Sequence, residues 1–153
     1  KLGKQFIEMD ALIEQKAGKP IPRIFAEDGE IAFRELELAV TKEIAARKNV
    51  VIACGGGLVL NRINIDRLKQ ESVIVYLTAA PGLILKRTAG DESRPLLNTD
   101  DRVRRIRQLL KFRKPFYERA ADITINTSRL NIESVVKLII GRVKVHESLH
   151  SAE

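Results

Sequence analysis

Residues 50–57 read VVIACGGG, and this stretch decides the fold class. Five apolar residues, 50–54, are followed at once by Gly55, Gly56 and Gly57. A continuous apolar run of this length predicts a strand that is buried on both faces, as in a parallel sheet covered by helices. Ligands of open α/β sheets bind beyond the carboxyl ends of such strands. The three glycines therefore mark the first candidate binding loop.

The glycine triplet has two interpretations. Without Cβ atoms, its backbone can adopt positive φ values and let a ligand approach its N–H groups. A tight turn between a strand and a helix would also use a glycine, with no ligand involved. Three glycines in a row directly after a strand favour a loop that contacts a ligand.

Outward from this stretch, periodicity and turn residues predict an alternation of strands and helices. We expect strands at residues 5–8, 50–54, 73–77 and 122–126. We expect helices at residues 10–17, 22–26, 30–47, 61–70, 81–90, 102–119 and 131–143. This order predicts an α/β fold, a three-layer sandwich with a central parallel sheet between helices. One domain would span residues 1–143, and residues 144–153 would form a C-terminal tail.

The composition narrows the class of protein. The 153 residues suit one compact domain, and 44% apolar with 31% charged residues exclude wholesale disorder. No apolar run approaches the roughly 20 residues that span a bilayer, so we expect no membrane partner. A single cysteine, Cys54, excludes an intrachain disulfide and fits a reducing compartment. We therefore expect a cytoplasmic protein.

The charge is unevenly distributed along the chain. The formal net charge is +7, and eight Lys or Arg lie between residues 102 and 119. Such an excess favours polyanionic partners, and nucleic acid is one candidate. Aromatic residues make up only 5% of the chain, with no Trp, so platforms for stacking bases are lacking. Small phosphorylated ligands fit this cluster as well as nucleic acid does.

Two carboxylates follow the first predicted strand. Glu8 and Asp10 stand two residues apart, so both can leave toward the same end of the sheet. Such a pair could hold Mg²⁺ through water and orient or deprotonate a hydroxyl. Alternatively, Asp10 could merely cap the helix that follows.

Three arginines could contact an anion. Arg113 lies on the apolar stripe of the helix at residues 102–119, and an inward guanidinium needs an anionic partner. That partner could be a structural carboxylate or a ligand carboxylate held bidentately. Arg94, in a polar loop, could neutralise charge on a transferred phosphoryl group, or could simply be an exposed loop residue. Arg34, in the first turn of its helix, is ambiguous alone.

Taken in chain order, these pieces resemble the shikimate kinase family. The stretches FIEMD (6–10), IFAEDGE (24–30), FR (33–34), GGG (55–57), RPLL (94–97) and RKPFY (113–117) follow that family's succession and approximate spacing. The resemblance covers residues 1–143. It implies a P-loop fold similar to the nucleoside monophosphate kinases, with a five-stranded parallel sheet and a lid near residues 88–100.

The resemblance also implies an activity. It is the ATP-dependent, Mg²⁺-requiring phosphorylation of the 3-hydroxyl of shikimate, in the pathway to chorismate and the aromatic amino acids, by a monomer. Asp10 would bind the ring hydroxyls of shikimate and orient or deprotonate the nucleophile. Arg34 and Arg113 would grip the shikimate carboxylate, with residues 55–57 lining the same pocket.

The remaining implied roles concern ATP and the metal. Arg94 would be the lid arginine on the phosphates, Arg87 would lie near the nucleotide, and the turn at Arg129 would approach the adenine. Glu8 would stand at the metal-associated position, where the family usually has Asp.

One departure from the family is large. Its first strand and G-x-x-x-x-G-K-[ST] phosphate loop have no counterpart in the 153 residues. Because that strand is central to the family's sheet, we expect two sheet halves with unpaired edges. We therefore expect an N-terminally incomplete view of a longer chain, inactive by itself. A non-catalytic, shikimate-kinase-like ligand-binding or regulatory module is the alternative, and a nucleic-acid-binding domain rests only on the charge.

Overall fold

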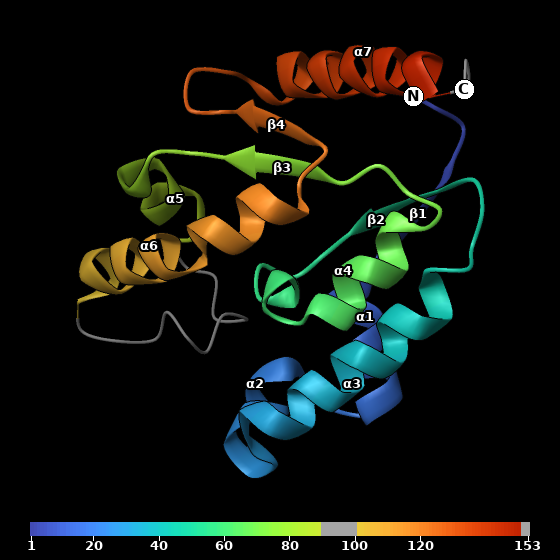
Figure 1. Ribbon diagram of the computed structural model, residues 1–153. Coiled ribbons are helices and arrows are strands. Elements are labelled where there is room, and N and C mark those ends of the chain that lie inside the picture. The colour runs from blue at the N-terminus through green and yellow to red at the C-terminus, as the bar shows by residue number, and fades with distance from the viewer. Residues whose placement is uncertain (90–100, 151–153) are drawn as a thin grey trace.

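The structure, a computed structural model, describes residues 1–89 and 101–150 (Figure 1). Its strands are β1 (Gln5–Glu8), β2 (Val50–Ala53), β3 (Val75–Thr78) and β4 (Ile123–Asn126). Its helices are α1 (Met9–Ala17), α2 (Ile21–Glu27), α3 (Gly29–Ile44), α4 (Arg62–Lys69), α5 (Pro81–Arg87), α6 (Arg102–Ala120) and α7 (Ile132–His150), with a short 3₁₀ turn, η1 (Leu58–Leu60), after β2. The predicted alternation of strands and helices is confirmed.

The four strands form two parallel pairs. β1 pairs with β2, and β3 pairs with β4, each in register over four residues. β2 and β3 are not hydrogen-bonded to each other, so the single central sheet predicted from the sequence is not formed by the described residues. The expectation of two sheet halves with unpaired edges is confirmed. Val51 of β2 and Leu77 of β3 are accordingly 44% and 47% exposed.

Helices α1 to α4 build a continuous core beside the β1–β2 pair. α3 packs against α1, α2 and α4, and Met9, Ile13, Ile24 and Ile44 are completely buried between them. α1 ends at Gly18, which adopts the left-handed φ of 70° that favours glycine at a helix C-terminus. α1, α2 and α4 thus fix the position of α3, and this core also fixes the carboxyl ends of β1 and β2.

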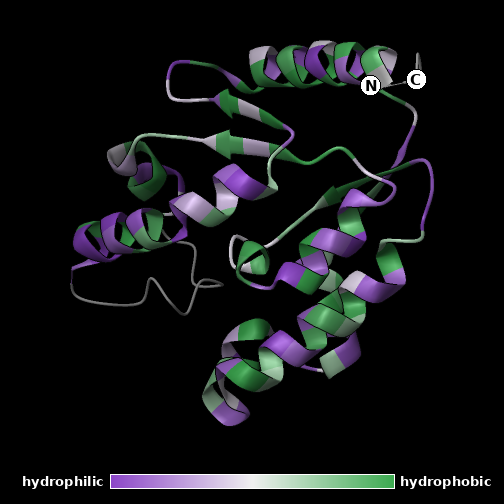
Figure 2. Cartoon of the chain, in the orientation of Figure 1, coloured by the Kyte–Doolittle hydropathy of each residue, from purple (hydrophilic) through white to green (hydrophobic). Residues whose placement is uncertain are grey.

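The β3–β4 pair lies between α7 and the two helices α5 and α6 in Figure 1. α6 packs against α5 and η1, and α7 packs against β4. α6 carries mostly hydrophilic residues (Figure 2), which agrees with the cluster of basic residues in its sequence. Its contact with η1 brings it next to the chain that leaves β2.

Helix α7 is longer than predicted. It continues to His150, past residue 143, where the sequence predicted the last helix to end. Residues 144–150 therefore extend the helix, and the division into a domain of residues 1–143 and a tail of residues 144–153 stays a prediction.

Within residues 1–89 and 101–150, no helix combines the length and the hydropathy needed to cross a membrane.

Candidate active site

The glycine triplet leaves β2 and enters η1. The carbonyl groups of Gly55 and Gly57 accept hydrogen bonds from the backbone N–H groups of Leu58 (3.2 Å) and Leu60 (3.1 Å). None of the three glycines adopts a positive φ, so the conformational reason that the sequence suggested for them is wrong. The side chains around the three glycines supply another reason: a residue with a Cβ atom would lack space there.

Each glycine lies against a charged or polar side chain. A Cβ at Gly57 would lie 2.5 Å from both terminal nitrogens of Arg34, closer than any side chain allows. A Cβ at Gly55 would lie 3.2 Å from Oδ1 of Asp10, and one at Gly56 would lie 3.7 Å from Nη1 of Arg113. The loop therefore brings Asp10, Arg34 and Arg113 together, as the family resemblance implied.

Asp10 reaches the loop through the register of the strands. Glu8 pairs with Ala53, so Asp10 and Gly55 each lie two residues beyond a paired position. α1 begins at Met9, and its N-cap residue is Glu8, whose side chain makes no capping hydrogen bond. Asp10 stands inside the first turn, and the capping role considered for it is therefore not observed. Its carboxylate faces Gly55 instead.

Arg34 is held by two carboxylates of its own helix. Its Nη1 donates to both oxygens of Glu37 (3.1 and 3.0 Å), and its Nη2 donates to Glu30 (3.0 Å). Glu37 is 1% exposed. Burial raises the pKa of Glu37, while the charge and hydrogen bonds of Arg34 act in the opposite direction. These contacts lock the guanidinium against Gly57.

Arg113 points inward from α6, and its charge acts on the buried carboxylate of Glu37 through space, without a direct ion pair. Its Nε is buried and finds no hydrogen-bond partner, and no ion pair joins Arg113 to any residue in the described part of the chain. Arg113 is partly buried, and a guanidinium withdrawn from water without a direct partner is costly, so the position suits a ligand that brings a negative charge. This outcome favours the ligand carboxylate over the structural carboxylate among the two partners considered from the sequence.

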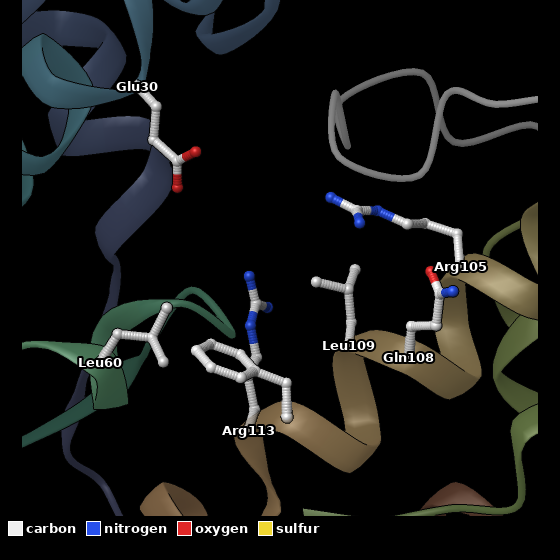
Figure 3. Close-up of a pocket in the computed structure, with 7 residues that line it drawn as sticks. Glu30, Leu60, Arg105, Gln108, Leu109 and Arg113 are labelled. Atoms are coloured by element: carbon white, nitrogen blue, oxygen red, sulfur yellow. The ribbon is translucent and has the colours of Figure 1, made fainter.

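A cavity of about 310 Å³ opens beside these residues. Figure 3 shows the Arg113 guanidinium rising from α6 into this space, with Glu30 opposite and Leu60 and Leu109 at its sides. Arg105, two turns earlier on α6, also lines it. The cavity thus combines cationic groups with an apolar wall, which suits a small organic anion.

Arg87 and Arg129 lie away from this cluster, at the end of the β3–β4 pair. The Arg87 guanidinium donates to the hydroxyl (2.9 Å) and the carbonyl (3.2 Å) of Thr127, which follows β4. Arg129 is exposed two residues further along the chain. The two arginines therefore belong to one neighbourhood. Arg94 and residues 90–100 of the predicted lid lie outside the described residues.

The metal prediction rests on Glu8 alone. Glu8 is exposed at the end of β1, and the described residues contain no group of three or more His, Cys, Asp or Glu side chains that could hold a metal ion. Cys54 is a free cysteine and is exposed. Desolvation, followed by the charges of Glu37 and Asp10, raises the pKa of Cys54 to about 11, so it stays a neutral thiol.

Two residues of the site were missed from the sequence. Glu37 lies on the buried face of α3 between Phe33 and Val40. A carboxylate among apolar residues at helical spacing was the sequence signal that could have identified it. Tyr117 donates a hydrogen bond of 2.6 Å from its hydroxyl to the carbonyl of Gly56. No sequence signal pointed to this contact, because the two residues are 61 positions apart.

Comparison with known proteins agrees with this geometry. The shikimate kinase family model matches residues 1–144. A shikimate kinase of Caldanaerobacter subterraneus subsp. tengcongensis is 45% identical over 135 residues, which are 88% of this chain and 78% of that protein. One of Pelotomaculum thermopropionicum is 38% identical over 95% of this chain and 84% of its own length.

Solved structures give the same result for the fold. The structure of shikimate kinase from Acinetobacter baumannii in complex with shikimate superposes with a TM-score of 0.90 at 37% identity, covering 94% of this chain and 80% of that one. Shikimate kinase from Aquifex aeolicus gives a TM-score of 0.79 at 31% identity, covering 95% and 84%. With Asp10, Arg34 and Arg113 gathered around three glycines and with this extent of similarity, the chain belongs to the shikimate kinase family.

Proposed function

We propose that this shikimate kinase transfers the γ-phosphate of ATP to the 3-hydroxyl of shikimate at the cavity between α3, η1 and α6, beside the glycine loop. The observation that carries the proposal is the gathering of Asp10, Arg34 and Arg113 around residues 55–57. The shikimate complex of the related Acinetobacter baumannii enzyme supports the choice of ligand.

The arginines would bind the carboxylate of shikimate. Arg34 is prearranged by Glu37 and Glu30, and Arg113 has a buried Nε without a partner. A planar guanidinium can hold a carboxylate through two parallel hydrogen bonds, which fixes the orientation of the ring as well as its position. The carboxylate would also give Arg113 a direct anionic partner, which none of the described residues provides.

Asp10 would act on the hydroxyl. Its carboxylate lies at the carboxyl end of the β1–β2 pair, next to Gly55, where it can accept the proton of a ring hydroxyl and orient its oxygen toward the phosphate. Phosphoryl transfer depends mainly on positioning and charge neutralisation, so no covalent enzyme intermediate is needed.

The ATP side of the site rests on the second strand pair. Arg87 and Arg129 would contact the nucleotide, and Arg94 would neutralise charge on the transferred phosphoryl group. Mg²⁺ commonly binds through one or two carboxylates plus substrate phosphates, and exposed Glu8, two residues before Asp10 in the chain, fits that pattern. The ion would neutralise phosphate charge, while Glu8 would hold its water shell.

The resemblance supports further proposals for the working enzyme. Both strand pairs would belong to one central parallel sheet in a three-layer sandwich, with a lid near residues 88–100. We further propose that the enzyme is a cytoplasmic monomer, in keeping with its one free cysteine.

The test is shikimate-dependent formation of ADP by the full-length protein. We expect Asp10→Asn to lower kcat by a factor of about 10² to 10⁴, the usual contribution of general acid–base catalysis. Asp66→Asn is the matched control, because Asp66 is an exposed carboxylate on α4, 60% accessible, and its one ion pair within the described residues is with Arg62, one helical turn away. Near-normal turnover in Asp10→Asn would remove the role assigned to Asp10. Absence of turnover in the folded wild type would leave a ligand-binding module.

A further inference from the structure

The carbonyl groups of the three glycines are held in different ways. Those of Gly55 and Gly57 accept from backbone N–H groups three residues further along the chain. That of Gly56 accepts from the hydroxyl of Tyr117 on α6, at 2.6 Å. The middle peptide of the loop is therefore oriented by a side chain, and not by the local turn.

This contact also fixes the next residue. A trans peptide is planar, so holding the C=O of Gly56 also sets the N–H of Gly57, which points in the opposite direction. Gly57 is the glycine that packs against the Arg34 guanidinium. The hydroxyl of Tyr117 thereby determines how the loop lies beside one of the two carboxylate-binding arginines.

Tyr117 is itself well anchored. Its ring stacks on that of Tyr76 in β3, with centroids 4.6 Å apart and an interplanar angle of 14°. It stands four residues after Arg113, so both side chains lie on the same face of α6. Tyr117 thus connects the β3–β4 pair to the glycine loop of the β1–β2 pair, and does so beside Arg113.

We propose that Tyr117 is a positioning residue of the shikimate site, whose hydroxyl aligns the glycine loop between Arg34 and Arg113. The proposal rests on the carboxylate-binding roles proposed for these two arginines. Tyr117 would affect the binding of shikimate and leave the binding of ATP unchanged.

The test is Tyr117→Phe in the full-length enzyme, with steady-state kinetics in both substrates. We expect the KM for shikimate to rise about fivefold, the loss typical of one neutral hydrogen bond, with the KM for ATP unchanged and kcat within about twofold. Tyr76→Phe is the matched control: it removes a hydroxyl from the other ring of the stack, which makes no hydrogen bond to the described residues. It should leave both KM values unchanged.

A second variant tests the same contact from the loop. A Cβ at Gly56 would lie 3.2 Å from the Tyr117 hydroxyl oxygen, so Gly56→Ala should displace that oxygen and raise the KM for shikimate in the wild-type background. Phe at position 117 leaves room for the methyl group. Gly56→Ala should therefore add little to Tyr117→Phe, and the double variant should resemble the single one. Additive effects would overturn the proposal.

The outcomes separate this proposal from the proposed function. A folded wild type without shikimate-dependent turnover would contradict the proposed function itself. An active wild type whose Tyr117→Phe variant keeps a normal KM for shikimate, or shifts both KM values together, would contradict the role of Tyr117. If Tyr117→Phe fails to fold, a wild-type KM for shikimate in Gly56→Ala overturns the proposal, and a raised value supports it.

Discussion

The two strand pairs have similar short parallel strands but very different cores. Beside β1 and β2, buried apolar residues form one continuous cluster that runs from Ile7 to Leu68 in the sequence. Beside β3 and β4, the buried apolar side chains in the described part of the chain are few: Ile106, Ala120, Ile123 and Ile125. Packing therefore holds the first half together more completely than the second.

The difference extends to the charged residues of each half. Arg34 is fixed by Glu37, which is buried in the first half. Arg87 is itself exposed and is fixed by hydrogen bonds to Thr127, a buried but uncharged residue of the second half. Proteins position a ligand most accurately with side chains whose own rotamers are locked by packing. The proposed shikimate side is thus prearranged by its core, and the proposed nucleotide side by a few polar contacts.

The largest expected effect tests the two cores directly. Ile44→Ala, in the first half, should lower the free energy of unfolding by about 4 kcal/mol, because a dense core cannot collapse into the cavity. Ile106→Ala, in the second half, should cost about 2 kcal/mol, because exposed neighbours can move into the gap. Urea unfolding of both variants checks this. An equal cost at the two positions would show that packing does not distinguish the halves.

The next effect tests how tightly the first half is fitted around its ligand site. Gly57→Ala would place a methyl group 2.5 Å from both terminal nitrogens of Arg34, so the guanidinium must leave its place beside Glu37. We expect kcat/KM for shikimate to fall about 100-fold, or about 2.7 kcal/mol, with the KM for ATP unchanged.

Gly82→Ala is the matched control for this variant. Gly82 has no positive φ, and nothing lies within 4 Å of the position of its Cβ on α5. Both kinetic parameters should stay at their wild-type values. A loss in Gly57→Ala that falls equally on ATP would show a general distortion of the protein and would contradict the local fit.

The sequence predicted this half of the site well where the signals were local. The apolar run at residues 50–54 and the glycines are adjacent, so the strand and the loop after it could be recognised together. Asp10 followed from the end of another strand, and Arg113 from its place on an apolar stripe. In each case a short pattern determined both the element and the direction of the side chain.

Contacts between distant segments escaped prediction for physical reasons. α3 contains several glutamates, and only the packing of α1 and α4 around it decides that Glu37 is buried while Glu30 stays half-exposed. The reason for the glycines was also hidden, since a need for space and a need for positive φ leave the same residue in the sequence. The loop shows that space was the reason.

The smallest effect concerns the buried carboxylate that holds Arg34. Burial raises the pKa of Glu37 above its ordinary value of 4.5 in spite of the Arg34 guanidinium. Between pH 4.5 and that raised pKa, the folded state binds more protons than the unfolded state, so this group makes stability fall as pH rises. Glu37→Gln cannot titrate. The difference in unfolding free energy, wild type minus variant, should therefore decline as the pH rises above 4.5.

Glu37→Gln should gain in stability relative to the wild type as the pH rises, but its activity should be lower than that of the wild type. Arg34 keeps its ion pair with Glu30, so the variant leaves no charge stranded and should fold normally at neutral pH. The guanidinium of Arg34 loses the negative charge of its buried partner, however, and kcat/KM for shikimate should therefore fall about tenfold, or about 1.4 kcal/mol. A difference in unfolding free energy that stays constant from pH 4 to pH 8 would contradict the raised pKa. Unchanged kinetics would show that Arg34 is positioned by Glu30 and Gly57 alone, and that the buried core adds nothing to the accuracy of this side of the site.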